Sequence, residues 1–387
     1  MSSFDEYILS IQGLILRFYT YEGIVEALDG VNLNIKPAEI LGLVGETGCG
    51  KSVTSLSILN LVPPPGRIEG GEITLREGEK TINILEQHED FLRKIRGNLI
   101  SMIFQEPRAY LNPVFTVEEQ LGEVLVQHRL GELLNSTIQK IDMELEKADK
   151  LKRHLLMLHK KLCLKMLKNP RSLSVRVASK IPLVNGFKSK LRMEIRKKVV
   201  ELLKDMEIPD PQRVARMYPH ELSGGMAQRV VIAMALACNP KLLIADEPTT
   251  NLDVTVQAQI LHLIRVLREK YKSSILYITH DLGVVAELCD RVAVMYAGNV
   301  VELADVYEIF KNPLHPYTRA LLESIPRPGK EFKSIPGTVP SLINPPSGCR
   351  FHDRCQFAME ICNKVKPKFI EVGKDHYVAC HLFGGGK

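Results

Sequence analysis

Tryptophan is absent from this sequence, and aromatic residues make up only 6% of its 387 positions. Surfaces on which nucleic-acid bases stack are built from aromatic side chains, so the composition gives no sign of one. Long hydrophobic runs are also missing, because the longest, residues 230–238, is far shorter than the ~18 apolar residues that a membrane-spanning helix requires. The N-terminal residues include Asp5 and Glu6 where a signal peptide would have basic side chains. We therefore expect a cytoplasmic protein that does not cross a membrane by itself.

The residues that are present, 45% hydrophobic and 25% charged, are typical of a globular protein. At ~100 to 200 residues per domain, the length predicts two or three domains. The net charge of +6 is unevenly distributed, because residues 129–198 contain 19 basic and 6 acidic side chains, a local charge of +13 that leaves −7 for the rest. Such a basic segment is most often the solvated face of helices. The alternative is contact with an anionic surface, either lipid head groups or a nucleic acid.

Apolar residues within this basic segment recur every three to four positions, apart from one step of six between Leu145 and Leu151, and this pattern predicts one long amphipathic helix. Pro170, Pro182 and Gly186 end this helix, and residues 190–206 predict a second one, so that the segment would form a helical hairpin. The apolar positions of the first helix are Ile138, Ile141, Leu145, Leu151, Leu155, Leu158 and Leu162.

Short runs of β-branched and apolar residues predict strands, and helical patterns lie between the later ones. The predicted strands cover residues 7–11, 15–18, 31–35, 40–44, 100–104, 242–245 and 275–279. Alternation of strands and helices predicts an α/β fold with a mostly parallel sheet, whose ligand site lies beyond the C-terminal ends of the strands.

A glycine-rich loop follows the predicted strand at residues 40–44 and precedes a helical pattern at residues 53–61. It matches the pattern G-x-x-x-x-G-K-[ST] of a phosphate-binding loop at every fixed position. The glycines let backbone N–H groups and the helix N-terminus face the phosphates of a nucleotide. Lys51 would reach the β- and γ-phosphates, and the Ser52 hydroxyl would bind Mg²⁺. The predicted nucleotide-binding residues are Gly45, Glu46, Thr47, Gly48, Cys49, Gly50, Lys51, Ser52 and Val53.

An acidic pair, Asp246 and Glu247, ends the predicted strand at residues 242–245. Beside a phosphate-binding loop, the first carboxylate would hold Mg²⁺ together with Ser52. The second would polarise the water that attacks the γ-phosphate. The sequence therefore predicts hydrolysis of a nucleoside triphosphate with Mg²⁺.

Residues 222–229, which read Leu-Ser-Gly-Gly-Met-Ala-Gln-Arg, resemble the signature motif of the ATP-binding-cassette (ABC) ATPases. Gln105 resembles the Q-loop of that family, residues 250–253 its D-loop and His280 its switch histidine, and all of them occur in the family's order. The resemblance implies a P-loop NTPase core with an N-terminal antiparallel β subdomain and an α-helical subdomain. It also implies that ATP is hydrolysed in a head-to-tail dimer, between the phosphate loop of one subunit and the signature motif of the other.

The resemblance also implies individual roles. Glu247 would be the catalytic base, His280 would hydrogen-bond the γ-phosphate, and Gln105 would sense that phosphate, contribute to the Mg²⁺ site and contact the transmembrane partner. The residues that the resemblance adds to the nucleotide site are Ser223, Gly224, Gly225 and Asp253.

Three further positions are compared with the pattern of the family, one in the signature motif and two ahead of the phosphate loop. Ala227 stands where related importers usually have a basic residue, so a local salt bridge would be weaker. An aromatic residue that stacks on adenine is expected ahead of the phosphate loop. Tyr19 and Tyr21 are both candidates, and simple packing on a β-strand is the alternative for each.

Four stretches, residues 104–113, 253–260, 315–321 and 335–351, resemble the oligopeptide/dipeptide importer subfamily. This implies an ATPase subunit on the cytoplasmic face of the cell membrane. Its partners would be a second ABC ATPase subunit, two transmembrane permease subunits and an extracellular solute-binding protein, with no nucleic acid. An importer of oligosaccharides or nickel and a soluble ABC ATPase acting on nucleic acid or ribosomes stay open, whereas the importer-type tail disfavours an exporter.

Four cysteines crowd the tail at the spacing C-x5-C-x6-C-x17-C. Disulfides are disfavoured in the cytoplasm, so a soft-metal site is the better account, and four thiolates suit either Zn²⁺ or an iron-sulfur cluster. The resemblance to importer subunits with such a tail favours a [4Fe-4S] cluster, while Zn²⁺ and unmetallated thiols or disulfides stay open. These cysteines are Cys349, Cys355, Cys362 and Cys380.

Together these patterns predict three parts of the chain. Residues 1–105 and 230–311 would form the ABC ATPase core. Residues 106–229 would form the helical subdomain, with the basic insertion at about residues 129–198. Residues 312–387 would form a small Cys-rich C-terminal domain.

Overall fold

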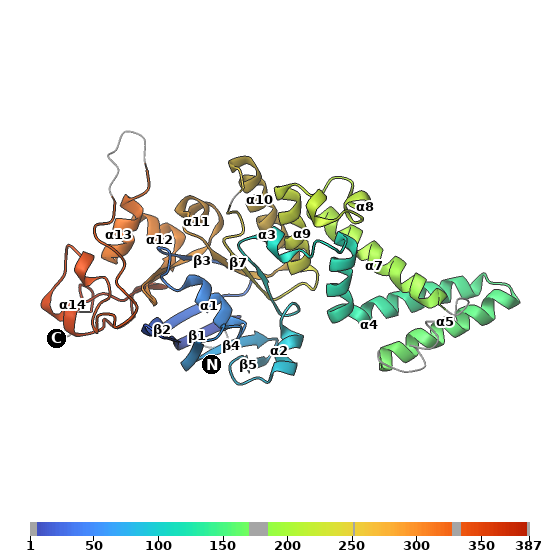
Figure 1. The fold of residues 1–387 in the computed structure, drawn as a ribbon, viewed down its shortest axis with the longest axis horizontal. Helices are drawn as coiled ribbons and strands as arrows, with labels where there is room; N and C mark the ends of the chain where they lie inside the picture. Colours follow the sequence, from blue (N-terminus) through green and yellow to red (C-terminus); the bar gives the residue numbers. More distant parts are fainter. Residues whose placement is uncertain (1–5, 170–184, 251, 327–333, 385–387) are drawn as a thin grey trace. The chain divides into compact units, whose positions relative to one another are not determined.

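The structure, a computed structural model, describes residues 6–169, 185–250, 252–326 and 334–384. Figure 1 shows its helices and strands. The chain divides into two compact units, of which one combines residues 1–105 with 240–387 and the other consists of residues 106–239.

An eight-stranded sheet forms the centre of the first unit, in the order β11-β12-β10-β9-β3-β8-β7-β6. Its strands are β3 (Ile40–Val44), β6 (Ile100–Ile103), β7 (Leu242–Asp246), β8 (Ser274–Ile278), β9 (Arg291–Tyr296), β10 (Asn299–Asp305), β11 (Ile370–Gly373) and β12 (His376–Val378). The neighbours from β9 to β6 are parallel, and the pairs that involve β10, β11 and β12 are antiparallel. Helices α1 (Lys51–Ile58), α10 (Val254–Tyr271) and α11 (Leu282–Leu288) follow β3, β7 and β8 along the chain. The predicted α/β fold with a mostly parallel sheet is confirmed.

A second, antiparallel sheet in this unit has the order β2-β1-β4-β5. Its strands are β1 (Leu9–Thr20), β2 (Gly23–Ile35), β4 (Gly66–Glu77) and β5 (Lys80–Asn83), and α2 (Glu89–Ile95) follows them. The prediction of two separate strands at residues 7–11 and 15–18 is wrong, because the single strand β1 extends through both ranges. Its register shifts between Ile11 and Leu14, where Gly13 adopts a φ of 57° that other residues rarely take. The polar interruption in the sequence is thus a β-bulge and not a loop.

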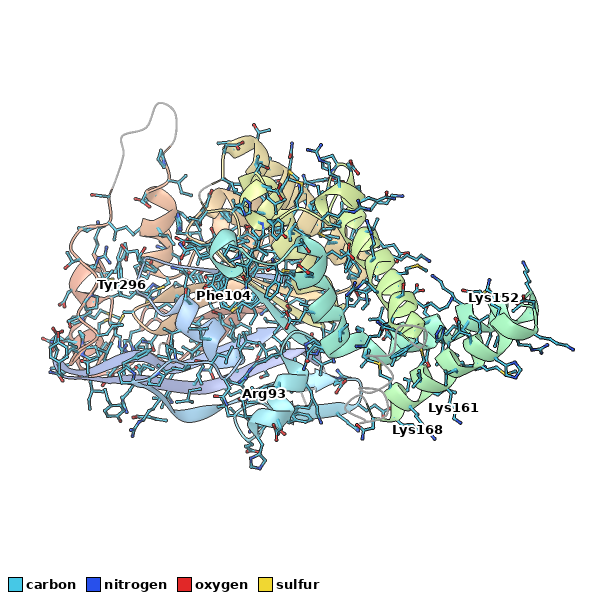
Figure 2. The ribbon with its side chains drawn as sticks, turned by 45° about the vertical axis from the view of Figure 1, so that its right-hand side comes forward. Arg93, Phe104, Lys152, Lys161, Lys168 and Tyr296 are labelled. Atoms are coloured by element: carbon cyan, nitrogen blue, oxygen red, sulfur yellow. The ribbon has the colours of Figure 1, made fainter. Side chains whose placement is uncertain are left out.

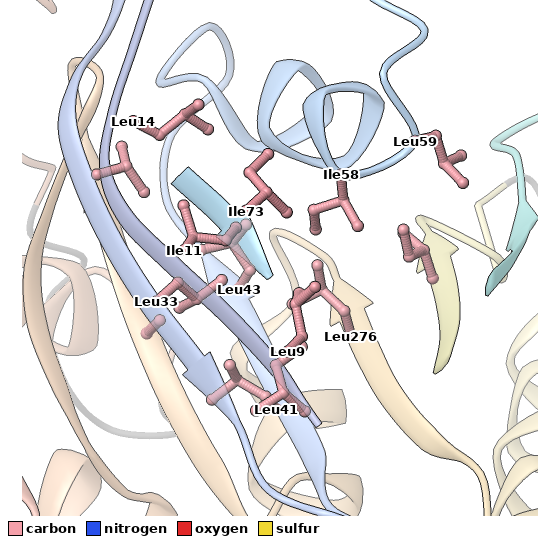
Figure 3. Packing of buried hydrophobic residues seen from close by; sticks show 14 of the residues in the cluster. Leu9, Ile11, Leu14, Leu33, Leu41, Leu43, Ile58, Leu59, Ile73 and Leu276 are labelled. Carbon is pink, nitrogen blue, oxygen red and sulfur yellow. The ribbon is translucent and has the colours of Figure 1, made fainter. Parts of the chain in front are cut away.

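The hydrophobic core of the first unit lies between the two sheets, as Figure 3 shows. Leu9 and Leu33 from the antiparallel sheet belong to the same buried cluster as Leu41 and Leu43 from β3 and Ile58 from α1. Each of these side chains is at most 1% exposed. Removing one such leucine typically costs about 2–5 kcal/mol of stability. This core fixes β3 and α1, and therefore the loop that joins them.

The second unit is helical. Its elements are α3 (Pro107–Tyr110), α4 (Val117–Glu146), α5 (Lys150–Lys168), α7 (Gly186–Asp205), α8 (Pro211–Val214), η2 (Pro219–Glu221) and α9 (Gly224–Leu236). The single long helix predicted for the basic segment is wrong, because α4 ends at Glu146 and α5 begins at Lys150. The Asp149 side chain accepts a hydrogen bond from the Lys152 backbone N–H at 3.2 Å, so it caps a new helix where the apolar spacing alone would continue the old one.

Helices α4, α5 and α7 pack against one another in this unit. Leu156 and Leu162 of α5 are buried, whereas Lys152, Lys161 and Lys168 extend outward from the helix in Figure 2. The predicted second helix of the segment is confirmed as α7. Pro170 and Pro182 lie outside the described residues.

The C-terminal residues belong to the first unit and extend its large sheet, because β12 pairs with β10. Their helices are α12 (Val306–Lys311), α13 (Pro316–Glu323), η3 (His352–Arg354) and α14 (Glu360–Lys364). Across the described parts of the chain, no helix is long and apolar enough to cross a membrane.

Candidate nucleotide site

The glycine-rich loop joins β3 to α1, as its spacing predicts, although α1 starts two positions earlier and ends three positions earlier than the predicted helix. Gly50 caps α1 with a φ of 108°, in the region that other residues avoid. At Gly45, any Cβ would lie 2.1 Å from the Met295 carbonyl oxygen. Both glycines are therefore required by the path of the loop, which lies against the end of β9.

Lys51 and Ser52 begin α1 at the end of this loop. The Lys51 ammonium group is buried and donates hydrogen bonds to the carbonyl oxygens of Gly45 at 2.8 Å and Glu46 at 3.1 Å. The lysine thus spans the mouth of the loop, where it could exchange these bonds for phosphate oxygens. Cys49 is buried within the loop, and burial raises the pKa of its thiol.

Asp246 ends β7, and Ser52, which follows the loop, lies close enough to affect its carboxylate. Burial raises the pKa of Asp246, and Ser52 and the charge of Lys51 act in the opposite direction. A hydroxyl and a carboxylate held together at the phosphate loop are the oxygen donors that Mg²⁺ prefers.

Glu247 brings together the two residues that are predicted to act on the γ-phosphate. Its Oε2 accepts hydrogen bonds from Gln105 Nε2 at 3.1 Å and from the Thr250 hydroxyl at 3.0 Å. Its Oε1 lies 3.1 Å from His280 Nδ1, and because a carboxylate can only accept, the ring nitrogen is the donor. Glu247 itself has a φ of 46°, so the backbone turns sharply at the strand end to aim the side chain. The geometry therefore joins Gln105, Glu247 and His280 into one group.

The predicted residues of the D-loop and the signature motif lie at helix N-termini. Asp253 caps α10 by accepting a hydrogen bond from the Val256 backbone N–H at 2.9 Å. In the helical unit, Ser223 caps α9 by accepting from the Met226 backbone N–H at 3.3 Å, and Gly224 and Gly225 form the first turn. Such a helix end, with free N–H groups and no acidic residue in its first turn, favours an anionic group.

The two candidate tyrosines differ in their surroundings. The Tyr19 hydroxyl donates to Glu69, and the Arg67 guanidinium carbon lies 5.3 Å from the centre of its ring. Tyr19 is 42% exposed and Tyr21 is 97% exposed. Contacts with Glu69 and Arg67 therefore fix the side chain of Tyr19 more firmly than that of Tyr21. Stacking of either tyrosine on adenine stays a prediction.

The predicted metal site in the tail is not confirmed. Within the described ranges, no group of three or more His, Cys, Asp or Glu side chains is arranged to hold a metal ion. The four tail cysteines are free thiols. The pKa of Cys349 is raised to about 12, mainly by burial, with smaller contributions in the same direction from the neighbouring Cys362, Cys380 and Cys355. The thiols are thus close enough to interact electrostatically.

Two residues that touch the phosphate loop are missed by the sequence analysis. Tyr317 and Arg354 bind the backbone and side chain of Glu46 from positions 271 and 308 residues further along the chain. No local pattern in the sequence connects residues at such separations.

Comparison with known proteins agrees with this geometry. The family described as ABC transporter matches residues 28–250, and the family described as oligopeptide/dipeptide transporter, C-terminal region, matches residues 301–362. The chain is 43% identical over 378 residues to a probable peptide ABC transporter ATP-binding protein of Sinorhizobium fredii, covering 96% of this chain and 94% of the relative. It is also 43% identical over 380 residues to an oligopeptide transport ATP-binding protein of Bacillus subtilis, covering 97% and 88%.

Solved structures support the same fold. The structure of a dimeric ATP-binding cassette in a post-hydrolysis state, bound to ADP and Pi, matches with a TM-score of 0.53 and 26% sequence identity, covering 77% of this chain and 98% of that one. A subunit of an ABC transporter complex from Clostridium perfringens matches with a TM-score of 0.52 and 25% identity, covering 79% and 92%.

Proposed function

Because the chain belongs to the ABC transporter ATPases of the oligopeptide/dipeptide importer family, we propose that it hydrolyses ATP to power the uptake of peptides through an ABC importer. The observation that carries the proposal is the arrangement at the phosphate loop. Ser52 lies beside Asp246, while the neighbouring Glu247 accepts hydrogen bonds from Gln105 and His280. The alternative of a soluble ATPase acting on nucleic acid has no comparable support, since the relatives named above are peptide-transport proteins.

Each side chain at the site then has a role. The loop and Lys51 bind the phosphates of ATP, and Ser52 and Asp246 hold Mg²⁺, with Gln105 completing its surroundings. Glu247 polarises the attacking water. His280 bonds the γ-phosphate, and Tyr19 or Tyr21 stacks on adenine. Mg²⁺ neutralises charge that develops on the phosphoryl group when it is bound.

Completion of the site requires a second subunit. The N-terminus of α9, at residues 223–225, would bind the γ-phosphate of an ATP held by the partner's loop, and Asp253 would line the same interface. A structural relative is described as dimeric, which supports this reading. The partner is either a second copy or a related ABC ATPase.

Membrane attachment provides the test of the transport role. Chain purified from gently solubilised membranes is expected to co-elute with two permease subunits and a second ABC ATPase, identified by mass spectrometry. Elution without any permease would contradict the importer assignment, and permeases specific for oligosaccharide or nickel would correct the solute.

The same membrane preparation tests whether the basic side chains of α5 contact anionic lipid. If the lysines of α5, such as Lys152, Lys161 and Lys168, face anionic lipid at the cytoplasmic surface, each contributes about 1 kcal/mol of attraction that salt screens. Washing membranes with high salt before solubilisation would then release part of the chain. Retention at every salt concentration would favour the alternative, a solvated helical hairpin with attachment through permeases alone.

The tail cysteines are proposed as a structural [4Fe-4S] site, with Zn²⁺ as the alternative. The support is the mutual electrostatic effect of Cys349, Cys355, Cys362 and Cys380 and the donor chemistry of four thiols. Protein purified without oxygen is expected to be brown, with about four iron and four sulfide per chain. Cys355→Ser should bleach it, whereas Cys163→Ser, which removes a buried cysteine of the helical unit, should not. A colourless chain with one zinc would replace the cluster with Zn²⁺, and a metal-free chain would remove the site.

A further inference from the structure

Arg354, at the end of η3, holds the side chain of Glu46 in the phosphate loop. Its Nη1 donates to Glu46 Oε2 at 2.7 Å and its Nη2 to Oε1 at 3.0 Å, so the two groups form a bidentate pair. Its Nε donates to the Pro336 carbonyl at 2.8 Å. The Arg354 side chain is only 5% exposed, and the bond to Glu46 raises the pKa of its guanidinium. The pair is thus partly shielded from the screening that weakens surface ion pairs, since the Glu46 side chain is 27% exposed.

Aromatic rings fix this arginine in place. Its guanidinium carbon lies 5.7 Å from the centre of the Tyr296 ring and 5.9 Å from that of Phe351. Tyr317 packs against both rings, with centroid distances of 4.6 and 5.4 Å, and its hydroxyl accepts a hydrogen bond from the Glu46 backbone N–H at 2.9 Å. Glu46 is therefore held by its side chain and its backbone at the same time, in both cases by the C-terminal residues.

Arg350 supports the loop from a second direction. Its Nη1 donates to the Ala297 carbonyl at 2.7 Å and to the Glu26 carbonyl at 3.1 Å. The next residue after Ala297, Gly298, donates its backbone N–H to the carbonyl of Cys49 in the loop at 2.8 Å. Arg350 thus reaches the loop only indirectly, through Ala297 and Gly298, whereas Arg354 contacts Glu46 directly.

We propose that the segment from Arg350 to Arg354 positions the phosphate loop for ATP, with Arg354 as its main positioning residue. Two physical reasons support this. The loop contains Gly45, Gly48 and Gly50, all at positive φ, so without external contacts it would lose much conformational entropy on binding. In addition, Glu46 places a negative charge in a loop that must accept a triphosphate, and Arg354 neutralises that charge. The C-terminal tail is then part of the ATP site and not merely an appendage.

The inference rests on the proposed function, since it concerns ATP binding by the same loop. It is tested by equilibrium binding of ATP with Mg²⁺ to the full chain, with thermal unfolding measured in parallel. We expect Arg354→Gln to weaken ATP binding about tenfold, because it leaves the Glu46 carboxylate unpaired beside the phosphates. Adding Glu46→Gln should restore binding to within about threefold of the parent, because the uncompensated charge is removed. A residue that only held the tail together would show no such rescue.

Matched controls separate this role from tail stability. Asp375 also joins the tail to the core, through Lys36 Nζ at 3.0 Å, and its backbone N–H donates to Glu371 within the tail. Asp375→Asn should leave ATP binding within twofold of the parent. If Arg354→Gln does not fold, Tyr317→Phe keeps the ring and removes only the hydroxyl, and we expect it to weaken ATP binding about threefold.

The outcomes are distinct. Binding by Arg354→Gln or Tyr317→Phe within twofold of the parent would overturn the inference, as would a double variant that binds no better than Arg354→Gln alone. Failure of the proposed function has a different result, in which the parent chain does not bind ATP or Lys51→Ala binds it equally well.

Discussion

Glu247→Gln is expected to lower ATP turnover by roughly 10²- to 10⁴-fold, the usual contribution of a catalytic base. The substitution removes the carboxylate that would polarise the attacking water, but it keeps the size of the side chain and one oxygen that can accept from Gln105 or Thr250. Lys51 and the Ser52–Asp246 pair are untouched. ATP binding should therefore stay within about threefold of the parent, so that the loss falls on kcat and not on KM.

The measurement is steady-state ATP hydrolysis by the assembled transporter, together with equilibrium ATP binding to the variant. Glu287→Gln is the matched control, because Glu287 is an exposed carboxylate that pairs with Arg265 at 3.7 Å on the surface. Hydrolysis by Glu247→Gln at the parent rate would show that another group is the base. An equal loss in Glu287→Gln would point to general damage to the fold.

Much of the nucleotide site could be predicted from the sequence because its parts are local. The phosphate loop is a continuous run between β3 and α1, and Asp246 and Glu247 directly follow an apolar strand, so neighbouring residues determine their placement. The hydrogen bonds of Glu247 to Gln105 and His280 follow from the parallel sheet, which brings the C-terminal ends of β6, β7 and β8 to one edge.

The features that could not be predicted depend on single capping residues or on distant contacts. The predicted helix runs through residues 147–149, where the Asp149 cap divides it into α4 and α5. The bulge at Gly13 joins two predicted strands into one. Arg354 reaches Glu46 across 308 positions, and nothing near either residue indicates the other. The cap and the bulge are local features that apolar spacing alone does not reveal, whereas tertiary packing decides the contact of Arg354 with Glu46, and a single sequence does not record it.

Gly225→Asp is expected to reduce hydrolysis by the assembled dimer by roughly 10²- to 10³-fold, the range found when a preorganised donor of a reacting anion is lost. Gly225 lies in the first turn of α9, next to the Ser223 cap. An acidic residue at this position favours the helix itself, since it interacts well with the N-terminal end of the dipole. The same charge would repel the γ-phosphate of an ATP held by the partner's loop. The variant should therefore fold as well as the parent and still fail in turnover.

Gly225→Asn provides the control, because it has nearly the same shape as aspartate without the charge, and it should lose much less activity. Neither substitution should affect ATP binding to the isolated chain. The chain binds ATP with its own loop at residues 45–52, whereas its signature motif acts on the nucleotide of the partner.

If the chain forms a homodimer, mixing two inactive variants tests whether loop and signature act between two subunits or within one chain. Lys51→Ala lacks a working loop and Gly225→Asp lacks a working signature, yet a mixed dimer has one site in which both are intact. Recovery of activity on mixing the two inactive variants is therefore expected, and its absence in a demonstrated homodimer would mean that loop and signature act within one chain.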